Sequence, residues 1–192
     1  MALILGLVGE KLAGKDAAGS YLVEHHQAFY IKYSHILNEI LEMLNMPISR
    51  ENEILLGKGL RDNFQRNVLW QAMKKRLEES SQDIKVIGSI RLEDEFKAAK
   101  DLGAKMIYIT APAPTRYERF MNRREKTDDG TQSMEEFIHN ERGWTEVEIP
   151  KLGAMCDYAI ENTGSLEELY DKVDTMLEEI KNPGTVLVDE LE

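Results

Sequence analysis

The chain has 192 residues, 42% of them hydrophobic and 31% charged, which is ordinary for a globular domain with a sizeable core. Its net charge of −11 argues against a nucleic-acid-binding surface, which needs a basic footprint. A single cysteine excludes an internal disulfide, and we find neither a signal peptide nor an apolar run of about 20 residues, the length of a membrane span, so we expect a cytoplasmic protein that contacts no membrane.

The first predicted elements are a short apolar strand at 3–8 and a helix at 14–25, joined by a glycine-rich loop. The loop reads Gly-x-x-x-x-Gly-Lys-Asp from Gly9 to Asp16. Such a loop wraps its N–H groups around nucleotide phosphates, and its lysine reaches the outer phosphates. A plain glycine-rich turn is the alternative. The candidate nucleotide-binding residues are Gly9, Glu10, Lys11, Leu12, Ala13, Gly14, Lys15, Asp16 and Ala17.

Asp16 stands where such loops usually have a serine or threonine that holds Mg²⁺. One hypothesis is that Asp16 takes over Mg²⁺ binding through a water molecule. A second is that its carboxylate is only favoured by the dipole at the start of the helix. A third is a degenerate site with weak or no activity.

Strands and helices alternate along the rest of the chain. Further strands are expected at 28–32, 85–90, 106–110 and 158–160. Helices with approximate bounds are expected at 34–44, 61–80, 93–102 and 114–125, and Gly103 is a natural stop for the third of these. Three further helices are expected to begin at the capping residues Ser49, Ser133 and Ser165, and the last of them runs to about 181. An acidic tail at 183–192 is expected to fray.

This alternation predicts a three-layer α/β domain with a parallel sheet over 1–182, with a small helical lid at about 114–145. The active site of such a sheet lies at the carboxyl ends of its strands. The loops at 9–15, 32–35, 88–91, 111–115 and 161–165 should therefore converge on one face.

Arginines and one lysine gather in the predicted lid, at positions 116, 119, 123, 124 and 126. A local basic cluster on an acidic chain indicates a small anionic ligand. Arg116 and Arg124 are expected mainly to pair with nearby glutamates on the surface. Lys15, Arg91, Arg119 and Arg123 are the candidate catalytic residues, because arginines neutralise a migrating phosphoryl group. Arg61 and Arg91 are expected to bind the phosphate or carboxylate of the molecule that accepts the phosphoryl group.

Four stretches carry a resemblance to a known family. They are Ile90-Arg91-x-Glu93-x-Glu95-Phe96, Ala113-Pro114-x-Arg116-x-x-Arg119-Phe120-x-x-Arg123, Glu135-Glu136-Phe137-x-x-x-Glu141-Arg142 and Asp157-Tyr158-x-Ile160-x-Asn162-x-Gly164-Ser165. Together with the loop, they resemble the archaeal-type predicted nucleotide kinases related to adenylate kinase and dephospho-CoA kinase, which have a P-loop nucleoside triphosphate hydrolase-type fold. The Gly-Lys-Asp ending resembles that of phage deoxynucleoside monophosphate kinases.

The resemblance implies that Asn162 and Gly164 lie against adenine and that Ser34 belongs to the substrate-binding segment. One departure is Gly88, where such relatives usually have an aspartate.

The predicted function is transfer of the ATP γ-phosphoryl group, with Mg²⁺ at Asp16, to a small-molecule acceptor. A nucleoside or deoxynucleoside monophosphate is the first choice. Dephospho-CoA is one alternative, and a nucleotide-binding regulatory protein with weak ATPase activity is another. A GTPase would need an Asn-Lys-x-Asp element, which the chain lacks.

Overall fold

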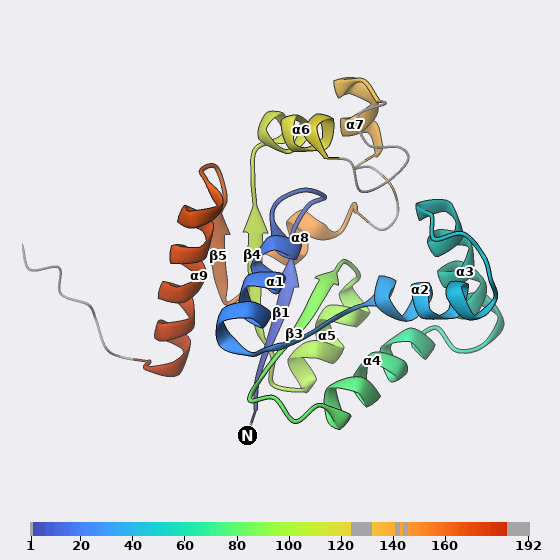
Figure 1. The fold of residues 1–192 in the computed structure, drawn as a ribbon, viewed down its shortest axis with the longest axis horizontal. Helices are drawn as coiled ribbons and strands as arrows, with labels where there is room; N and C mark the ends of the chain where they lie inside the picture. The colour runs from blue at the N-terminus through green and yellow to red at the C-terminus, as the bar shows by residue number, and fades with distance from the viewer. Residues whose placement is uncertain (1, 124–131, 141–142, 144–145, 184–192) are drawn as a thin grey trace, which may run out of the picture.

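The computed structural model describes residues 2–123, 132–140, 143 and 146–183. In this part of the chain, five parallel strands form one sheet in the order β2-β3-β1-β4-β5 (Figure 1). The strands are β1 (Leu3–Val8), β2 (Phe29–Lys32), β3 (Ile84–Ile90), β4 (Lys105–Thr110) and β5 (Tyr158–Glu161). The central strand β1 pairs with β3 on one side and with β4 on the other. The glycine-rich loop therefore leaves the sheet at its middle.

Helices cover both faces of the sheet. On one face, α1 (Lys15–His26) and α9 (Leu166–Lys181) pack against alternate strand residues such as Leu5 and Ile107. On the other face, a second core is formed with α2 (Tyr33–Met43), α4 (Val68–Glu79), α5 (Glu93–Asp101) and α8 (Ile149–Gly153). Because the strands are buried on both sides, each reads as a nearly continuous apolar run. The three-layer parallel α/β prediction is confirmed.

The remaining helices lie near the carboxyl ends of the strands. α6 (Ala113–Asn122) and α7 (Met134–Asn140) lie beyond these ends, at the top of Figure 1. α3 (Arg50–Asn63) packs on α2 and α4. The predicted lid at 114–145 includes residues 124–131, 141–142 and 144–145, which lie outside the described residues, as do Arg124, Lys126 and the predicted tail from 184 onward.

Local signals in the sequence predicted several helix ends correctly. The Ser49 hydroxyl accepts a hydrogen bond from the Asn52 N–H at 3.2 Å, as an N-cap does. Ser133 and Ser165 each form the reciprocal capping box with a glutamate three residues later. Gly103, with a φ of 79°, follows α5 as expected.

Two predicted helices have different bounds. The helix expected at 61–80 is divided, because α3 ends at Asn63 and α4 begins at Val68. Asparagine at 63 and 67 favours helix ends over interiors, since its side chain competes for backbone hydrogen bonds. The helix expected at 114–125 ends at Asn122, and Arg123 already has an extended backbone. Within the described residues, no helix is both long and apolar enough to span a bilayer.

Candidate functional site

The glycine-rich loop depends on its two glycines. Gly9 has a φ of 153° and Gly14 a φ of 112°, both in the region that favours glycine. A Cβ atom at Gly9 would lie 2.0 Å from the carbonyl oxygen of Ile109, and one at Gly14 would lie 2.3 Å from the side-chain nitrogen of Asn162. Strand β4 and the segment after β5 therefore approach the loop so closely that a side chain at either position would collide with them.

Lys15 lies beneath this loop and is only 5% exposed. Its ammonium donates hydrogen bonds to the carbonyl oxygens of Gly9 at 2.7 Å and Glu10 at 2.6 Å. Burial lowers the pKa of Lys15 to about 8, and the charge of Arg91 contributes in the same direction. The Lys15 ammonium thus has neutral carbonyl oxygens as its hydrogen-bond acceptors, and negatively charged phosphate oxygens could replace them.

Residues distant in sequence hold the outer side of the loop. Asn162 donates from its side chain to the Ala13 carbonyl at 2.9 Å. Arg119 donates to the Leu12 carbonyl at 3.2 Å and to the Asn162 carbonyl at 3.0 Å. Both side chains therefore fix the backbone of the loop. Gly164 lies farther along the same segment and is exposed, just before α9.

Arg116 corrects a prediction. It was expected to pair with a glutamate on the surface, but it is only 5% exposed. Its guanidinium donates to the carbonyl oxygens of Ala111 at 2.8 Å and Lys11 at 3.4 Å. Arg116 therefore also supports the loop, and its pKa is lowered because burial disfavours its charged form.

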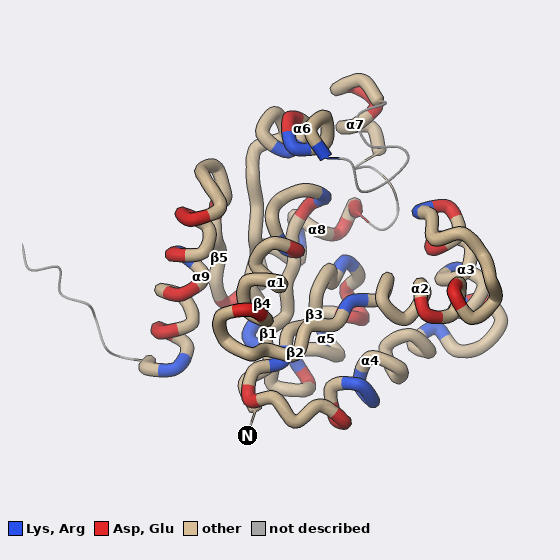
Figure 2. Tube along the Cα trace, viewed as in Figure 1, with Lys and Arg blue, Asp and Glu red and all other residues tan. Residues whose placement is uncertain are grey.

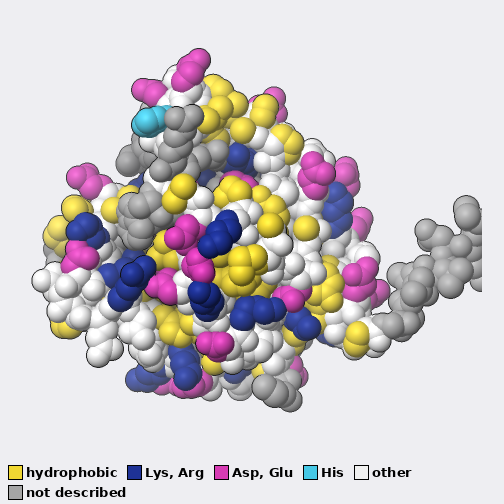
Figure 3. Space-filling model, turned by 180° about the vertical axis from the view of Figure 1, so that it is seen from behind, with side chains coloured by type: hydrophobic (Ala, Val, Ile, Leu, Met, Phe, Trp, Pro, Cys, Tyr) yellow, Lys and Arg dark blue, Asp and Glu magenta, His cyan; other side chains and the backbone are white. Residues whose placement is uncertain are grey.

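A cavity of about 420 Å³ opens at the carboxyl ends of the strands, beside the loop. It is lined by seven basic residues, Lys11, Lys15, Lys32, Arg50, Arg61, Arg91 and Arg123. Three acidic residues, Asp16, Glu53 and Glu95, lie among them. The lining thus has an excess of positive charge although the whole chain carries −11. Figure 2 shows basic positions on α6 and in the loops at this end of the sheet, whereas acidic and basic side chains alternate across the face in Figure 3.

This cavity brings together many of the predicted site residues. Besides the basic residues, Leu12, Asp16 and Ser34 line it. Arg119, Asn162 and Gly164 are not among its lining residues. Of the candidate catalytic arginines, Arg119 therefore holds the loop, whereas Arg123 lines the cavity. Leu12 and Ser89, which also line the cavity, have φ values of 65° and 61°. Such backbone strain in non-glycine residues is concentrated at functional sites.

The two arginines predicted to clamp an acceptor, Arg61 and Arg91, both line the cavity. Arg61 of α3 pairs with Glu95 of α5 at 3.2 Å, and its guanidinium lies 5.8 Å from the ring centroid of Tyr33. Arg91, directly after β3, pairs with Glu146, and its backbone N–H donates to Glu95 at 3.2 Å. Glu95 is only 7% exposed, and burial raises its pKa. The carboxylates hold both guanidinium groups at the cavity wall.

A second cavity of about 930 Å³ adjoins the first. The two share the lining residues Tyr33, Arg61, Leu92 and Glu95. Asn67, Trp70 and Val147 are among the residues that line only the larger cavity. The sequence did not predict this space, because it depends on the break between α3 and α4 at a position where the periodicity indicated one helix.

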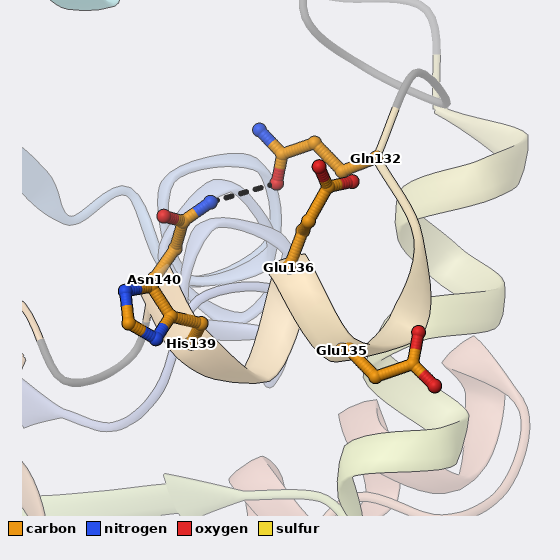
Figure 4. Close-up of a pocket in the computed structure, with 5 residues that line it drawn as sticks. All are labelled: Gln132, Glu135, Glu136, His139 and Asn140. Carbon is orange, nitrogen blue, oxygen red and sulfur yellow. Dashed lines mark hydrogen bonds between the residues drawn. The ribbon is translucent and has the colours of Figure 1, made fainter.

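A separate depression of about 450 Å³ lies on α7 (Figure 4). It is lined by Gln132, Glu135, Glu136, His139 and Asn140. The Asn140 amide donates to Gln132 at 3.0 Å, and the Glu136 carboxylate belongs to the helix cap. These groups serve α7 itself and lie apart from the loop.

Asp16 has two partners that the sequence analysis missed. Its Oδ1 atom accepts hydrogen bonds from the Tyr30 hydroxyl and from the Lys32 ammonium, both at 2.8 Å. Burial acts to raise the pKa of Asp16, but the charge and hydrogen bond of Lys32, with that of Tyr30, outweigh it and hold the pKa below its usual range. The available signal was the period of two in β2, which puts residues 30 and 32 on one face, beside the loop.

Tyr30 also explains Gly88, the departure from the resembling family. A Cβ atom at Gly88 would lie 2.5 Å from the Tyr30 ring, and one at Gly19 would lie 2.6 Å from it. The ring therefore lies between α1 and β3, over the position where an aspartate was expected. Among the described residues, no group of three or more histidine, cysteine, aspartate or glutamate side chains forms a metal site.

Comparison with known proteins assigns the chain to a family. A protein-family model described as an AAA domain matches residues 4–142, which include the loop and the basic cavity. The chain belongs to the AAA domain family. This AAA domain is 25% identical over 185 residues to a UPF0200 protein of Methanocaldococcus jannaschii, covering 94% of this chain and 91% of that one. A UPF0200 protein of Saccharolobus islandicus is 26% identical over 154 residues, which are 78% of this chain and 81% of the relative.

Solved structures share the fold of this AAA domain. A shikimate kinase from Acinetobacter baumannii in complex with shikimate has a TM-score of 0.60 at 16% identity, with 97% of each chain covered. A shikimate kinase from Bacteroides thetaiotaomicron has a TM-score of 0.61 at 12% identity, covering 92% of this chain and 98% of that one. The AAA domain thus has a P-loop kinase fold, and the P-loop is the one from Gly9 to Lys15.

Proposed function

We propose that the protein is a cytoplasmic kinase that transfers the γ-phosphoryl group of ATP to a nucleoside or deoxynucleoside monophosphate. The observation that carries this proposal is the cavity beside the P-loop, where seven basic side chains of an acidic protein meet. Two substrates that both carry phosphate need such an excess of positive charge. A protein that only hydrolysed ATP would not need Arg61 and Arg91 in the same cavity, because it binds no second phosphate.

Each side of the cavity has its own task. Lys15 exchanges the carbonyls of Gly9 and Glu10 for phosphate oxygens of ATP, while the N–H groups of the loop hold the same phosphates. Arg61 and Arg91 bind the phosphate of the acceptor, since a guanidinium fork matches two phosphate oxygens. Arg123 faces the cavity from the end of α6 and neutralises charge on the group in transit.

The reaction follows from these positions. An oxygen of the acceptor phosphate attacks the γ-phosphorus of ATP in line with the leaving group, and the bond to the β,γ-bridging oxygen breaks to release ADP. A Mg²⁺ ion bound between the phosphates would neutralise developing charge. Asp16 fits such an ion because carboxylate oxygen is a donor that Mg²⁺ prefers and because both of its hydrogen bonds use Oδ1.

The test is ADP release from ATP and Mg²⁺ with a panel of nucleoside and deoxynucleoside monophosphates, for the native protein and Lys15→Met. We expect turnover that depends on one class of acceptor, and a loss of roughly a hundredfold or more in the variant, because electrostatic stabilisation of the transferred group is a large contribution. ADP release at one slow rate whatever the acceptor would contradict the proposal and favour a regulatory ATPase.

One observation favours a second candidate acceptor. The larger cavity of about 930 Å³ meets the first at Arg61 and Glu95, so a long acceptor could place its phosphate at the arginines and its remainder in this space. Dephospho-CoA is such a molecule, and it belongs in the same panel. ADP release that depends on dephospho-CoA, and on none of the nucleoside or deoxynucleoside monophosphates, would identify dephospho-CoA as the acceptor.

A further inference from the structure

Asp16 is held by a cation of the protein itself. Lys32, the last residue of β2, donates to Asp16 Oδ1 at 2.8 Å, with the side chain of Lys32 22% and that of Asp16 62% exposed. The Tyr30 hydroxyl donates to the same oxygen at 2.8 Å. Because the Tyr30 ring fits between Gly19 and Gly88, its hydroxyl is fixed in place. The carboxylate thus has a built set of partners.

This arrangement has a consequence for ATP binding. The usual serine or threonine at this position is neutral, whereas Asp16 adds a negative charge where phosphates must come close. The ion pair with Lys32 cancels that charge. A divalent cation arriving with ATP would offer the same carboxylate a stronger counter-charge, and Lys32 lines the cavity into which its released ammonium could turn.

We propose that Lys32 is an internal counter-ion for Asp16, and that it competes for this carboxylate with the Mg²⁺ that accompanies ATP. Before Mg²⁺ binds, Lys32 keeps Asp16 from repelling the triphosphate. With Asp16 turned to Mg²⁺, the ammonium of Lys32 would be released into the cavity, where it would serve a phosphate oxygen. The inference rests on the proposed function only for ATP binding at the P-loop, and needs no acceptor.

The test measures ATP affinity by calorimetry, once with excess Mg²⁺ and once with EDTA. Lys32→Met keeps the aliphatic stem and removes the charge. Lys11→Met is the matched control, because Lys11 lines the same cavity but its ammonium lies over the Phe120 ring, 4.7 Å from the centroid. Lys32→Arg keeps the charge. Thermal unfolding of each variant checks that the fold is retained.

We expect Lys32→Met to weaken metal-free ATP binding more than binding with Mg²⁺. We divide the dissociation constant of ATP in EDTA by the one in excess Mg²⁺. Relative to the native protein, this ratio should rise roughly three- to tenfold more in Lys32→Met than in Lys11→Met, as fits a partly exposed ion pair. Lys32→Arg should keep the native ratio. In an Asp16→Asn background the excess effect of Lys32→Met should vanish, because no charge remains to be countered.

Two results would overturn this inference while leaving the kinase proposal intact. One is an equal change of the ratio in Lys32→Met and Lys11→Met. The other is an excess effect that persists in Asp16→Asn. Failure of the native protein to bind ATP under either condition would instead reject the proposed function, and the inference with it.

Discussion

At the scale of single residues, the site depends on charges held away from water. Lys15 is 5% exposed, and its ammonium donates hydrogen bonds to the carbonyl oxygens of Gly9 and Glu10. Burial, followed by the charge of Arg91, lowers its pKa to about 8. The lysine is therefore charged at neutral pH but lies close to losing its proton. Phosphate oxygens would stabilise the charged form, so nucleotide binding and protonation are coupled.

ATP affinity should consequently fall as the pH rises through the pKa of Lys15. Below about pH 8 the free protein already carries the proton that the complex needs. Above it, a proton must be taken up on binding, which costs affinity by about tenfold for each pH unit. Calorimetric titrations between pH 6.5 and 9.5 measure this. Lys15→Met should bind weakly without the decline, and a native affinity that stays level up to pH 9.5 would refute the coupling.

At the scale of elements, the short strand β2 shapes the Asp16 side of the P-loop. Its residue Tyr30 lies between Gly19 of α1 and Gly88 of β3, and its residue Lys32 reaches Asp16. Three elements thus meet at one aromatic ring. Gly88 is needed for packing, because any side chain there would occupy the space of the ring.

Gly88→Ala should therefore destabilise the fold. Its Cβ atom would lie 2.5 Å from Tyr30, and overpacking of this kind costs about 1–3 kcal/mol. Gly59→Ala in α3 is the matched control, since nothing lies within 4 Å of a Cβ atom there. That change should stabilise the protein by about 0.5–1 kcal/mol, through helix propensity. Urea unfolding measures both, and equal stabilities for the two variants would contradict the packing argument.

At the scale of the whole molecule, the part of the cavity proposed to bind the acceptor is assembled from separate parts of the chain. Arg61 comes from α3, Arg91 from the loop after β3 and Glu95 from α5. The buried Glu95 holds Arg61 by its side chain and the Arg91 backbone by an N–H hydrogen bond. The fold thus fixes the distance between the two arginines and the P-loop, which in the proposed reaction would set the alignment of ATP and its acceptor.

Arg61→Lys should raise the KM for the acceptor about ten- to hundredfold, because a bidentate contact to phosphate is lost. The affinity for ATP should change little. Lysine retains a positive charge for Glu95, which Arg61→Ala would leave buried without its partner.

Arg66→Ala is the control. The Arg66 side chain is 83% exposed and lines only the larger cavity. Steady-state kinetics with varied acceptor measures both, and an unchanged acceptor KM in Arg61→Lys would remove Arg61 from the clamp.

The sequence by itself determined the parallel α/β fold and the position of the P-loop. These signals are local, since apolar runs, capping serines and glycine spacing act within a few residues. Arg91 could be named as a candidate because it follows a predicted strand at its carboxyl end. Ser34 was a candidate only through the resemblance to a kinase family. The break between α3 and α4 was missed, because the apolar period continues through it.

The tertiary structure alone decided which side chains meet. Asn162 reaches Ala13 across 149 positions of sequence, Arg119 turned out to hold the loop, and Arg116 proved to be buried. Tyr30 and Lys32, which no motif in the sequence singles out, are the partners of Asp16. Such contacts have no local pattern, because they depend on the order of the strands and on burial, and both arise only when distant segments pack into one core.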